Sequence, residues 1–349
     1  MAADKLEMTD LAGIDPAWAW AAWQPNADSP WNRARAGHLY RRAGFAATWL
    51  RLDDALAAGH QATLDRLLEG EGETNRFYQD AARSAESLLA GGDPRQIAAW
   101  WLYVLVHSPH RLRERLTLFW HGHFATSGAK VTDGRLMYAQ NCLLRKHALG
   151  SFKPMLHEVS KDPAMLIWLD ATSNHKAHPN ENFAREVMEL FCLGVGNYSE
   201  HDIKEAARSF TGWELAHDQF RFNRHEHDAG QKTVLGRAGA FNGDDMLGIL
   251  LDHPATGRFL VRKLFRYLVS ETAEPAVALI EPLATGLRQR DYDLTWLVRT
   301  ILSSNLFFSP HAMRQRVKSP VELAVGLLRA IESPVNTYAL DEELRKLGQ

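Results

Sequence analysis

The sequence predicts a mainly α protein, built as a single large multi-helix domain with a small β-hairpin or long-loop insertion near residues 218–236. Three observations lead to this prediction. Apolar residues recur at helical spacing over most of the 349 residues, N-cap signals precede several of these segments, and strand-like alternation is confined to one stretch. A content of 46% hydrophobic and 23% charged residues is typical of a globular protein.

Several of the expected helices have recognisable ends. Asp93 precedes a proline and is predicted to be the N-cap of an amphipathic helix. A second helix is predicted to begin at Ser108 and, because glycines follow at 122 and 128, to end near Trp120. Segments 199–202 and 319–322 have the pattern of a capping box, which marks the start of a helix.

The insertion near residues 218–236 departs from the helical pattern. Phe220 and Phe222 alternate with polar residues, the chain then turns around residues 228–230, and apolar residues resume at 233–235. Alternation on both sides of a turn predicts a β-hairpin or a pair of long loops.

The first 30 residues are predicted to form a Trp-rich arm that precedes the helical domain at residues 31–349. Four tryptophans lie in or directly after this arm, namely Trp18, Trp20, Trp23 and Trp31. The favoured interpretation is that their side chains clamp the arm onto the domain. The alternative is a Trp-lined platform that binds carbohydrate.

Charge and hydropathy limit the classes of partner. A formal net charge of −2 gives no electrostatic argument for binding nucleic acid or an anionic membrane. No window approaches 18 uncharged apolar residues, so we expect no transmembrane segment. Cys142 and Cys192 are too few for a disulfide framework. As written, the chain is expected to be soluble and cytoplasmic, or exported if a leader precedes it.

The histidines of the segment FWHGHF are the first candidates for a site. His121 and His123 would share a face on an extended backbone, whereas residues two apart on a helix point about 200° away from each other. If the helix ends near Trp120, both imidazoles could bind one metal ion, which then needs a further protein ligand. The alternative is structural, with one histidine at the helix C-terminus and the other hydrogen-bonded in the core.

A second candidate is the charged helix that begins near residue 180. Glu181, Arg185 and Glu189 fall at i, i+4 and i+8 and form an acid–base–acid ladder, while Glu186 points elsewhere. Such a ladder usually holds helices together. Carboxylates on one helix also build the metal sites of helical bundles, and Glu189 would then be the third metal ligand.

A third candidate is the loop of the predicted insertion. It carries His225, His227, Asp228 and Lys232 within eight residues. Loops often hold functional residues on a rigid scaffold, so this group is a candidate catalytic or binding site. The alternative is a solvated turn.

Six ordered blocks of the sequence resemble one bacterial family, called domain of unknown function 1800. They are ARAGHLYRRAGF (34–45), LFWHGHFATS (118–127), DPAMLIWLD (162–170), PNENFAREVMELFCLGVGNYSEHDIKEAARSFTGW (179–213), HDAGQKTVLG (227–236) and RVKSPVEL (316–323). The resemblance extends from about residue 31 to the C-terminus and is strongest to members from planctomycete-type bacteria. The chain lacks the segment with which family members usually continue beyond Gly348-Gln349, so it is expected to be C-terminally incomplete or shortened.

The resemblance implies little about activity, because the family has none established. It implies that members are often exported and that their genes lie beside those of a sulfatase-like family, number 1501. The family's signature blocks contain His121, His123, Asn180, Glu181, Arg185, Glu186, His227, Asp228 and Lys232. Family members commonly have His or Thr where this chain has Cys192, which argues against a metal ligand there.

These candidates lead to two functional hypotheses. The first is a metal-dependent or acid–base hydrolase with a shared polar site. In it a divalent metal is held by His121, His123 and Glu189, catalysis uses Glu181, Glu186, Asp228 and Lys232, and substrate is bound by Asn180, Arg185 and His227. The second is a non-enzymatic scaffold or envelope-associated protein, paired with the sulfatase-like partner, in which the same residues form a salt-bridge network.

Overall fold

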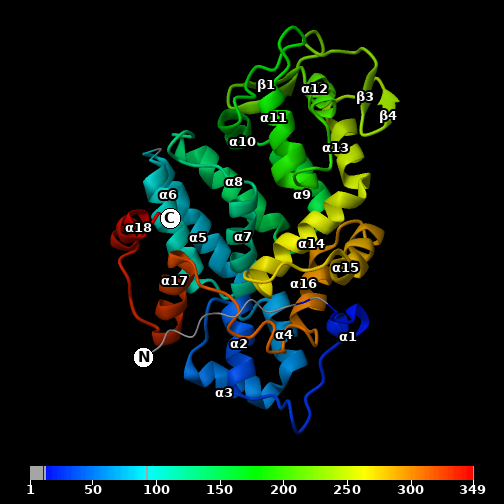
Figure 1. Cartoon of the computed structure of the whole chain (residues 1–349). Helices are drawn as coiled ribbons and strands as arrows, with labels where there is room; N and C mark the ends of the chain where they lie inside the picture. The colour runs from blue at the N-terminus through cyan, green and yellow to red at the C-terminus, as the bar shows by residue number, and fades with distance from the viewer. Residues whose placement is uncertain (1–10, 12, 92, 349) are drawn as a thin grey trace.

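The structure is a computed structural model that describes residues 11, 13–91 and 93–348. It confirms the prediction of a mainly α protein with a small β insertion. Figure 1 shows a lower group of helices, a central group and an upper group that carries the strands. The lower and central helices are α2 (Arg33–Ala43), α3 (Trp49–Ala58), α4 (His60–Glu69), α5 (Thr74–Leu89), α6 (Pro94–His107), α7 (Arg111–His123) and α8 (Gly134–His147).

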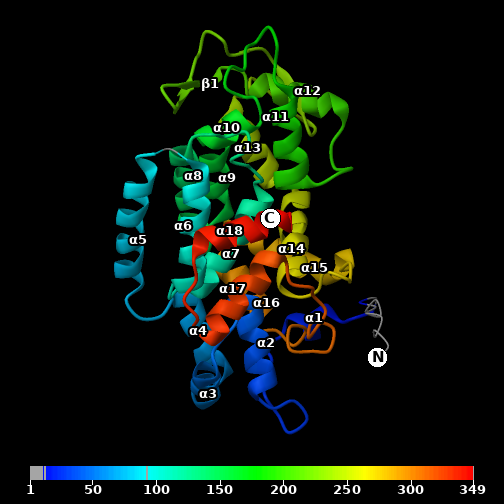
Figure 2. The same ribbon diagram turned by 90° about the vertical axis from the view of Figure 1, so that its left-hand side faces the viewer.

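The remaining helices complete the upper group and the two sides. The upper ones are α9 (Phe152–Ser160), α10 (Pro163–Trp168), α11 (Glu181–Glu186), the π-helix η1 (Val187–Leu193), α12 (Glu200–Ser209) and α13 (Gly243–Asp252). The other helices are α1 (Pro16–Trp20), α14 (Pro254–Leu268), α15 (Val277–Gln289), α16 (Leu294–Leu302), α17 (Pro320–Ile331) and α18 (Thr337–Lys346), of which α14 lies near the centre beside α7 (Figure 1). Figure 2 shows α5 on the outside of α6 and α8.

Helix α7 runs through the middle of the molecule and contacts α2, α4, α6 and α8 (Figure 1). Leu112, Leu116 and Trp120 are fully buried, because they recur on one helical stripe that faces the core. The helix continues to His123, so the prediction that it ends near Trp120 is wrong. Gly122 lies on the exposed side, where a glycine costs helix stability but breaks no packing.

The predicted helix starts are largely confirmed. The Asp93 carboxylate accepts a hydrogen bond from the Arg95 amide at 2.9 Å. Both capping boxes form, at 199–202 and at 319–322. Helix α7 begins at Arg111, slightly later than the predicted start at Ser108.

The insertion contains two successive hairpins. Strand β1 (Trp213–Ala216) pairs with β2 (Gln219–Phe222), and β3 (Lys232–Val234) pairs with β4 (Arg237–Gly239). The expected pairing across the turn at 228–230 therefore does not occur. Both hairpins have two-residue turns in which both central residues have positive φ, His217-Asp218 in the first and Leu235-Gly236 in the second.

Helix α11 passes directly into η1. In this π-helix each backbone amide donates a hydrogen bond to the carbonyl five residues earlier. The Gly194 amide donates to the Glu189 carbonyl at 3.1 Å and closes this segment. Gly194 has φ +76°, and a Cβ there would lie 3.0 Å from the Phe259 ring, so a glycine is needed at this end. π-Helical segments are costly and occur frequently at functional sites.

The tryptophans near the N-terminus pack against distant helices. Trp20 donates from Nε1 to the Leu279 carbonyl at 2.7 Å, and Trp31 donates to the Ala55 carbonyl at 2.9 Å. Trp23 is buried, with its ring 4.5 Å from that of Phe308. The described part of the arm is thus held against the helices; residues 1–10 and 12 of the predicted arm lie outside the described residues. No helix in the described ranges has the length and apolar character needed to cross a membrane.

Candidate functional site

The two histidines of FWHGHF point to different surroundings. Both belong to α7, where residues two apart face away from each other. The His121 ring packs edge-on against Trp101, with centroids 5.1 Å apart. His123 is 4% exposed and faces η1 and α14. The structure therefore does not bring His121 and His123 to a common ligand position.

Both ring nitrogens of His123 have partners. Nε2 lies 3.1 Å from the Phe191 carbonyl oxygen, and Nδ1 lies 3.1 Å from the Lys263 Nζ. A carbonyl only accepts, so Nε2 must carry the proton and donate it. Nδ1 is then the acceptor of a hydrogen bond from the Lys263 ammonium. The neighbours thus fix one neutral tautomer of His123.

The position of Lys263 follows from the end of the π-helix. The last carbonyls of a helix have no intrahelical partner and need donors from elsewhere. Lys263 Nζ donates to the Leu190 carbonyl at 3.2 Å, and His123 donates to the next carbonyl, that of Phe191. Helices α7, α14 and η1 therefore meet at these two side chains.

Lys263 lines a cavity of about 320 Å³ beside α7 and α14. Its ammonium lies 4.8 Å from the centroid of the Phe259 ring, and burial lowers its pKa to about 8. The exposed Arg266 and the Glu271 carboxylate lie on the same cavity. Arg266 forms no ion pair within the described part of the chain, which leaves a cation for an anionic ligand.

The cavity wall also contains Tyr267 and Arg316, and both are already engaged. The Tyr267 hydroxyl donates to the Arg115 carbonyl at 2.9 Å. Arg316 donates twice to Glu322 at 2.7 Å, and Arg115 pairs with the same carboxylate at 2.7 Å. Glu322 is 2% exposed, so this buried network holds the wall in place.

Both histidines of the motif are neutral at pH 7. Burial, followed by the charge of Lys263, lowers the pKa of His123 well below its usual value. Burial lowers the pKa of His121 to about 4. Lys263, whose pKa is about 8, is therefore the group of this site that titrates near neutral pH.

The predicted acid–base ladder is divided among other elements. Arg185 forms a bidentate pair with Glu200, at 2.9 and 2.6 Å. Glu189 accepts a hydrogen bond from the Tyr198 hydroxyl, while Glu181 is exposed at the start of α11. Burial, followed by the charge of Glu189, raises the pKa of Glu186.

Asn180 has a structural position. Its side-chain oxygen accepts from the Phe183 amide at 3.0 Å and caps α11, and its Nδ2 donates to the Asp170 carbonyl at 2.9 Å. Its own amide donates to the buried Asn174 at 2.9 Å. These bonds cap α11 and join it to the preceding loop.

The residues of the insertion loop are joined to α12. Asp228 accepts from Arg208 Nε at 2.7 Å, and this bond lowers the pKa of the carboxyl. Lys232 is 1% exposed and donates to the carbonyls of Asp228 and Gly230. His227 Nδ1 lies 2.9 Å from the Thr211 carbonyl. These side chains hold the loop together, away from the cavity of Lys263.

The predicted metal ligands His121, His123 and Glu189 contact different groups. Within residues 11, 13–91 and 93–348, no cluster of three or more His, Cys, Asp and Glu side chains is suitable for a metal ion. His123 would have to lose the Lys263 hydrogen bond before Nδ1 could bind a metal.

Sequence reasoning did not identify Lys263 and Arg266. A weak signal was present, because Lys263 interrupts the apolar residues of the amphipathic helix FLVRKLFRYLV. A charged residue beside an apolar stripe usually reaches solvent with its amine. Its role depends on the distant Leu190 carbonyl and on His123, which no local pattern reveals.

The sequence model of a family described as "Protein of unknown function (DUF1800)" matches residues 38–349. The chain belongs to this family. The DUF1800 match includes α7, η1 and α14, and therefore all the residues around Lys263. Searches of curated proteins and of solved structures found no match.

Proposed function

We propose that this DUF1800 protein is an acid–base enzyme in which Lys263 is the proton-transfer group and His123 is a positioning residue. The reaction class is hydrolysis, and the substrate is anionic. One observation carries the proposal: a lysine with a pKa of about 8 faces a cavity and is held there by a neutral imidazole.

The chemistry follows from the state of the amine. A pKa of about 8 leaves roughly a tenth of the molecules with a neutral amine at pH 7. The neutral amine removes a proton from water, and the oxygen forms a bond to the acyl or phosphoryl centre of the substrate. The bond to the leaving group breaks, and the ammonium returns the proton to the leaving oxygen. Arg266 attracts the anionic part of the substrate.

This proposal is the acid–base form of the predicted hydrolase. His123 does not accept the proton itself, because burial keeps its pKa well below neutral. His123 instead orients the Lys263 amine by the hydrogen bond that its Nδ1 accepts. The metal-dependent form would require the Lys263 ammonium to leave Nδ1 and two further ligands to approach.

A second candidate function, the non-enzymatic scaffold, is favoured by a different observation. The polar residues of two signature blocks pair with one another across elements, as in Arg185–Glu200 and Arg208–Asp228. Such pairs fix the positions of helices and loops rather than a substrate. Association with a sulfatase-like protein of family 1501 stays a prediction from the resemblance.

Hydrolysis of a panel of nitrophenyl esters and phosphates tests the proposal. We expect kcat/KM to rise with pH around a midpoint near 8, and Lys263→Met to lower it by about 10²- to 10⁴-fold. Lys161→Met is the matched control, because Lys161 also lies over an aromatic ring, that of Trp213. A wild type without activity on the panel, together with a Lys263→Met variant that is only less stable, would favour the scaffold.

A further inference from the structure

A second cavity lies between the lower helices and α17. Its volume is about 600 Å³, within the usual range for small-molecule sites. It is bounded by the start of α3, the link between α4 and α5, the turn between α6 and α7, and the end of α17. None of the residues that line it belongs to the cavity of Lys263.

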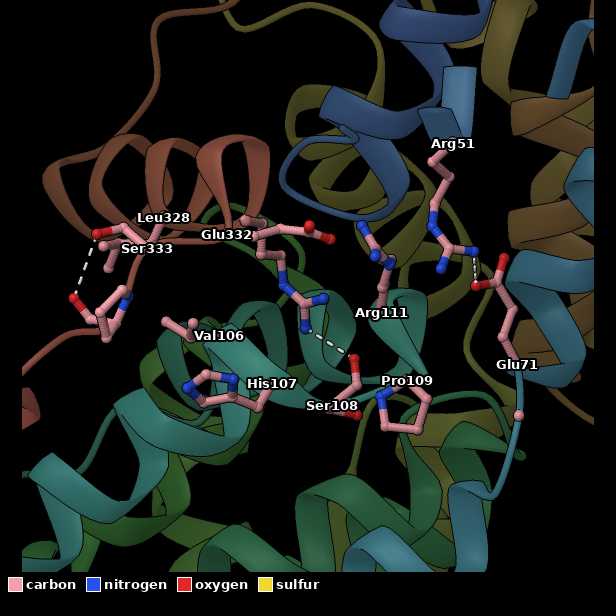
Figure 3. Close-up of a pocket in the computed structure, with 13 residues that line it drawn as sticks. Arg51, Glu71, Val106, His107, Ser108, Pro109, Arg111, Leu328, Glu332 and Ser333 are labelled. Carbon is pink, nitrogen blue, oxygen red and sulfur yellow. Dashed lines mark hydrogen bonds and ion pairs between the residues drawn. The ribbon is translucent and has the colours of Figure 1, made fainter. Parts of the chain in front are cut away.

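Three arginines line this cavity: Arg51, Arg111 and Arg329. Figure 3 shows Arg51 and Arg111 near one another at one end, beside Glu71, and Glu332 on the α17 side. The lining contains three guanidinium groups and two carboxylates, so its formal charge is +1. Burial followed by the charge of Arg51 lowers the pKa of Arg111. Glu71, which is ion-paired with Arg51, and Glu332 act in the opposite direction on this pKa, so a bound anion would add to the compensation that these carboxylates give.

Arg111 has unused hydrogen-bonding capacity. It is 9% exposed and donates from Nη1 to the Ala46 carbonyl at 2.9 Å. Its Nε is buried and has no hydrogen-bond partner among the described residues. A buried N–H group without a hydrogen-bond partner is costly, and an oxyanion can accept from several N–H groups of one guanidinium at once.

Arg329 is held in place beside Arg111. Its Nε donates to the Leu105 carbonyl at 2.8 Å and its Nη2 to the Ser108 carbonyl at 2.9 Å. Burial followed by the charge of Arg111 lowers its pKa to about 9. Its charge is thus fixed at the cavity wall by backbone carbonyls and is not neutralised by a carboxylate of its own.

The other end of the cavity contains apolar side chains beside the polar His107 and Ser333 (Figure 3). Val106 and Leu328 lie there, away from Arg51 and Arg111 (Figure 3). Pro109 lies near Arg111 at the cationic end (Figure 3). The cavity thus has cationic groups at one end and apolar side chains at the other. A ligand with an anionic group and an apolar body would fit both ends.

We propose that this cavity binds a small organic oxyanion, with a phosphate or carboxylate group at Arg51 and Arg111 and an apolar body against Val106 and Leu328. The site is separate from that of Lys263. Guanidinium groups pair with phosphate and carboxylate through two parallel hydrogen bonds, so both head groups fit this chemistry.

Isothermal titration with three probes at constant ionic strength tests this proposal. The probes are phenyl phosphate, benzoate and inorganic phosphate. We expect saturable binding, with phenyl phosphate or benzoate bound more tightly than inorganic phosphate, because the ring covers the apolar end. The tighter of the two ring compounds identifies the head group. No saturable binding of any probe at millimolar concentration would overturn the proposal.

Two variants change the charge in opposite directions. Arg51→Gln should weaken binding by about fivefold, and Glu332→Gln should strengthen it by about threefold, because Glu332 opposes the anion. Glu332 is exposed. Because unfolding would weaken binding, a gain of affinity in Glu332→Gln reports the change of charge. Arg299→Gln is the matched control. Arg299 has a similar exposure to Arg51 and is likewise ion-paired, in its case with Asp65, and this pair lies outside the cavity. Equal affinities in all four proteins would contradict the proposal.

Discussion

At the scale of single residues, the two histidines of one motif have different surroundings. His121 contacts the Trp101 ring, whereas His123 is hydrogen-bonded on both nitrogens and joins α7 to η1 and α14. The sequence alone presents them as an equivalent pair. The difference arises because they point to opposite sides of α7.

This difference predicts unequal effects of the same substitution. His123→Phe should lower the free energy of unfolding by about 1–3 kcal/mol, because the buried Phe191 carbonyl loses its donor. His121→Phe should change it by less than about 0.5 kcal/mol, because a phenyl ring can keep the contact with Trp101. Urea denaturation of the two variants measures this. Equal losses would contradict the assigned hydrogen bonds.

At the scale of elements, features that depend on neighbouring residues could be predicted from the sequence. Features that depend on distant residues could not. The N-cap at Asp93 and the capping boxes at 199–202 and 319–322 are set by residues within one turn, and all are confirmed. The β insertion is confirmed, but its hairpins turn at 217–218 and 235–236 rather than at 228–230, because these turns depend on positive φ, for which the sequence offers one glycine.

The candidate site was predictable only in part. His123 was identified from its motif, but its partner Lys263 lies 140 residues later and approaches through tertiary packing. The π-helix had no recognisable signal, because its residues VMELFCL also suit an α-helix. Arg185 and Asp228, from the two predicted polar clusters, pair with Glu200 and Arg208 of α12 rather than around a common pocket.

At the scale of the whole molecule, buried neutral histidines predict sensitivity to acid. Burial lowers the pKa of His38 to about 3, that of His110 to about 4, and that of His123 well below its usual value. Each folded pKa lies below that of the unfolded chain, so the unfolded chain takes up more protons below about pH 6.5. His38 and His110 should then each remove about 2 kcal/mol of stability at pH 5, and His123 acts in the same direction.

The buried carboxyl of Asp162 acts in the opposite direction. Burial raises the pKa of Asp162 to about 6, so its protonation stabilises the folded chain by about 1 kcal/mol at pH 5. We expect the histidines to dominate, and the free energy of unfolding in urea to fall by several kcal/mol between pH 7 and pH 5. His38→Gln should reduce this dependence, because it removes a histidine whose folded pKa is about 3. Equal stability at both pH values would contradict this prediction.

The central claim, that Lys263 is an amine poised for proton transfer, is tested most directly by nuclear magnetic resonance. Lysine labelled with carbon-13 at Cε reports the titration of each amine, and the Lys263→Met variant assigns the signal. The structure predicts a midpoint near pH 8 for Lys263, set by its burial beside Phe259 and His123. A midpoint at the ordinary value of about 10.4 would show a solvated amine and would contradict the proposed acid–base site.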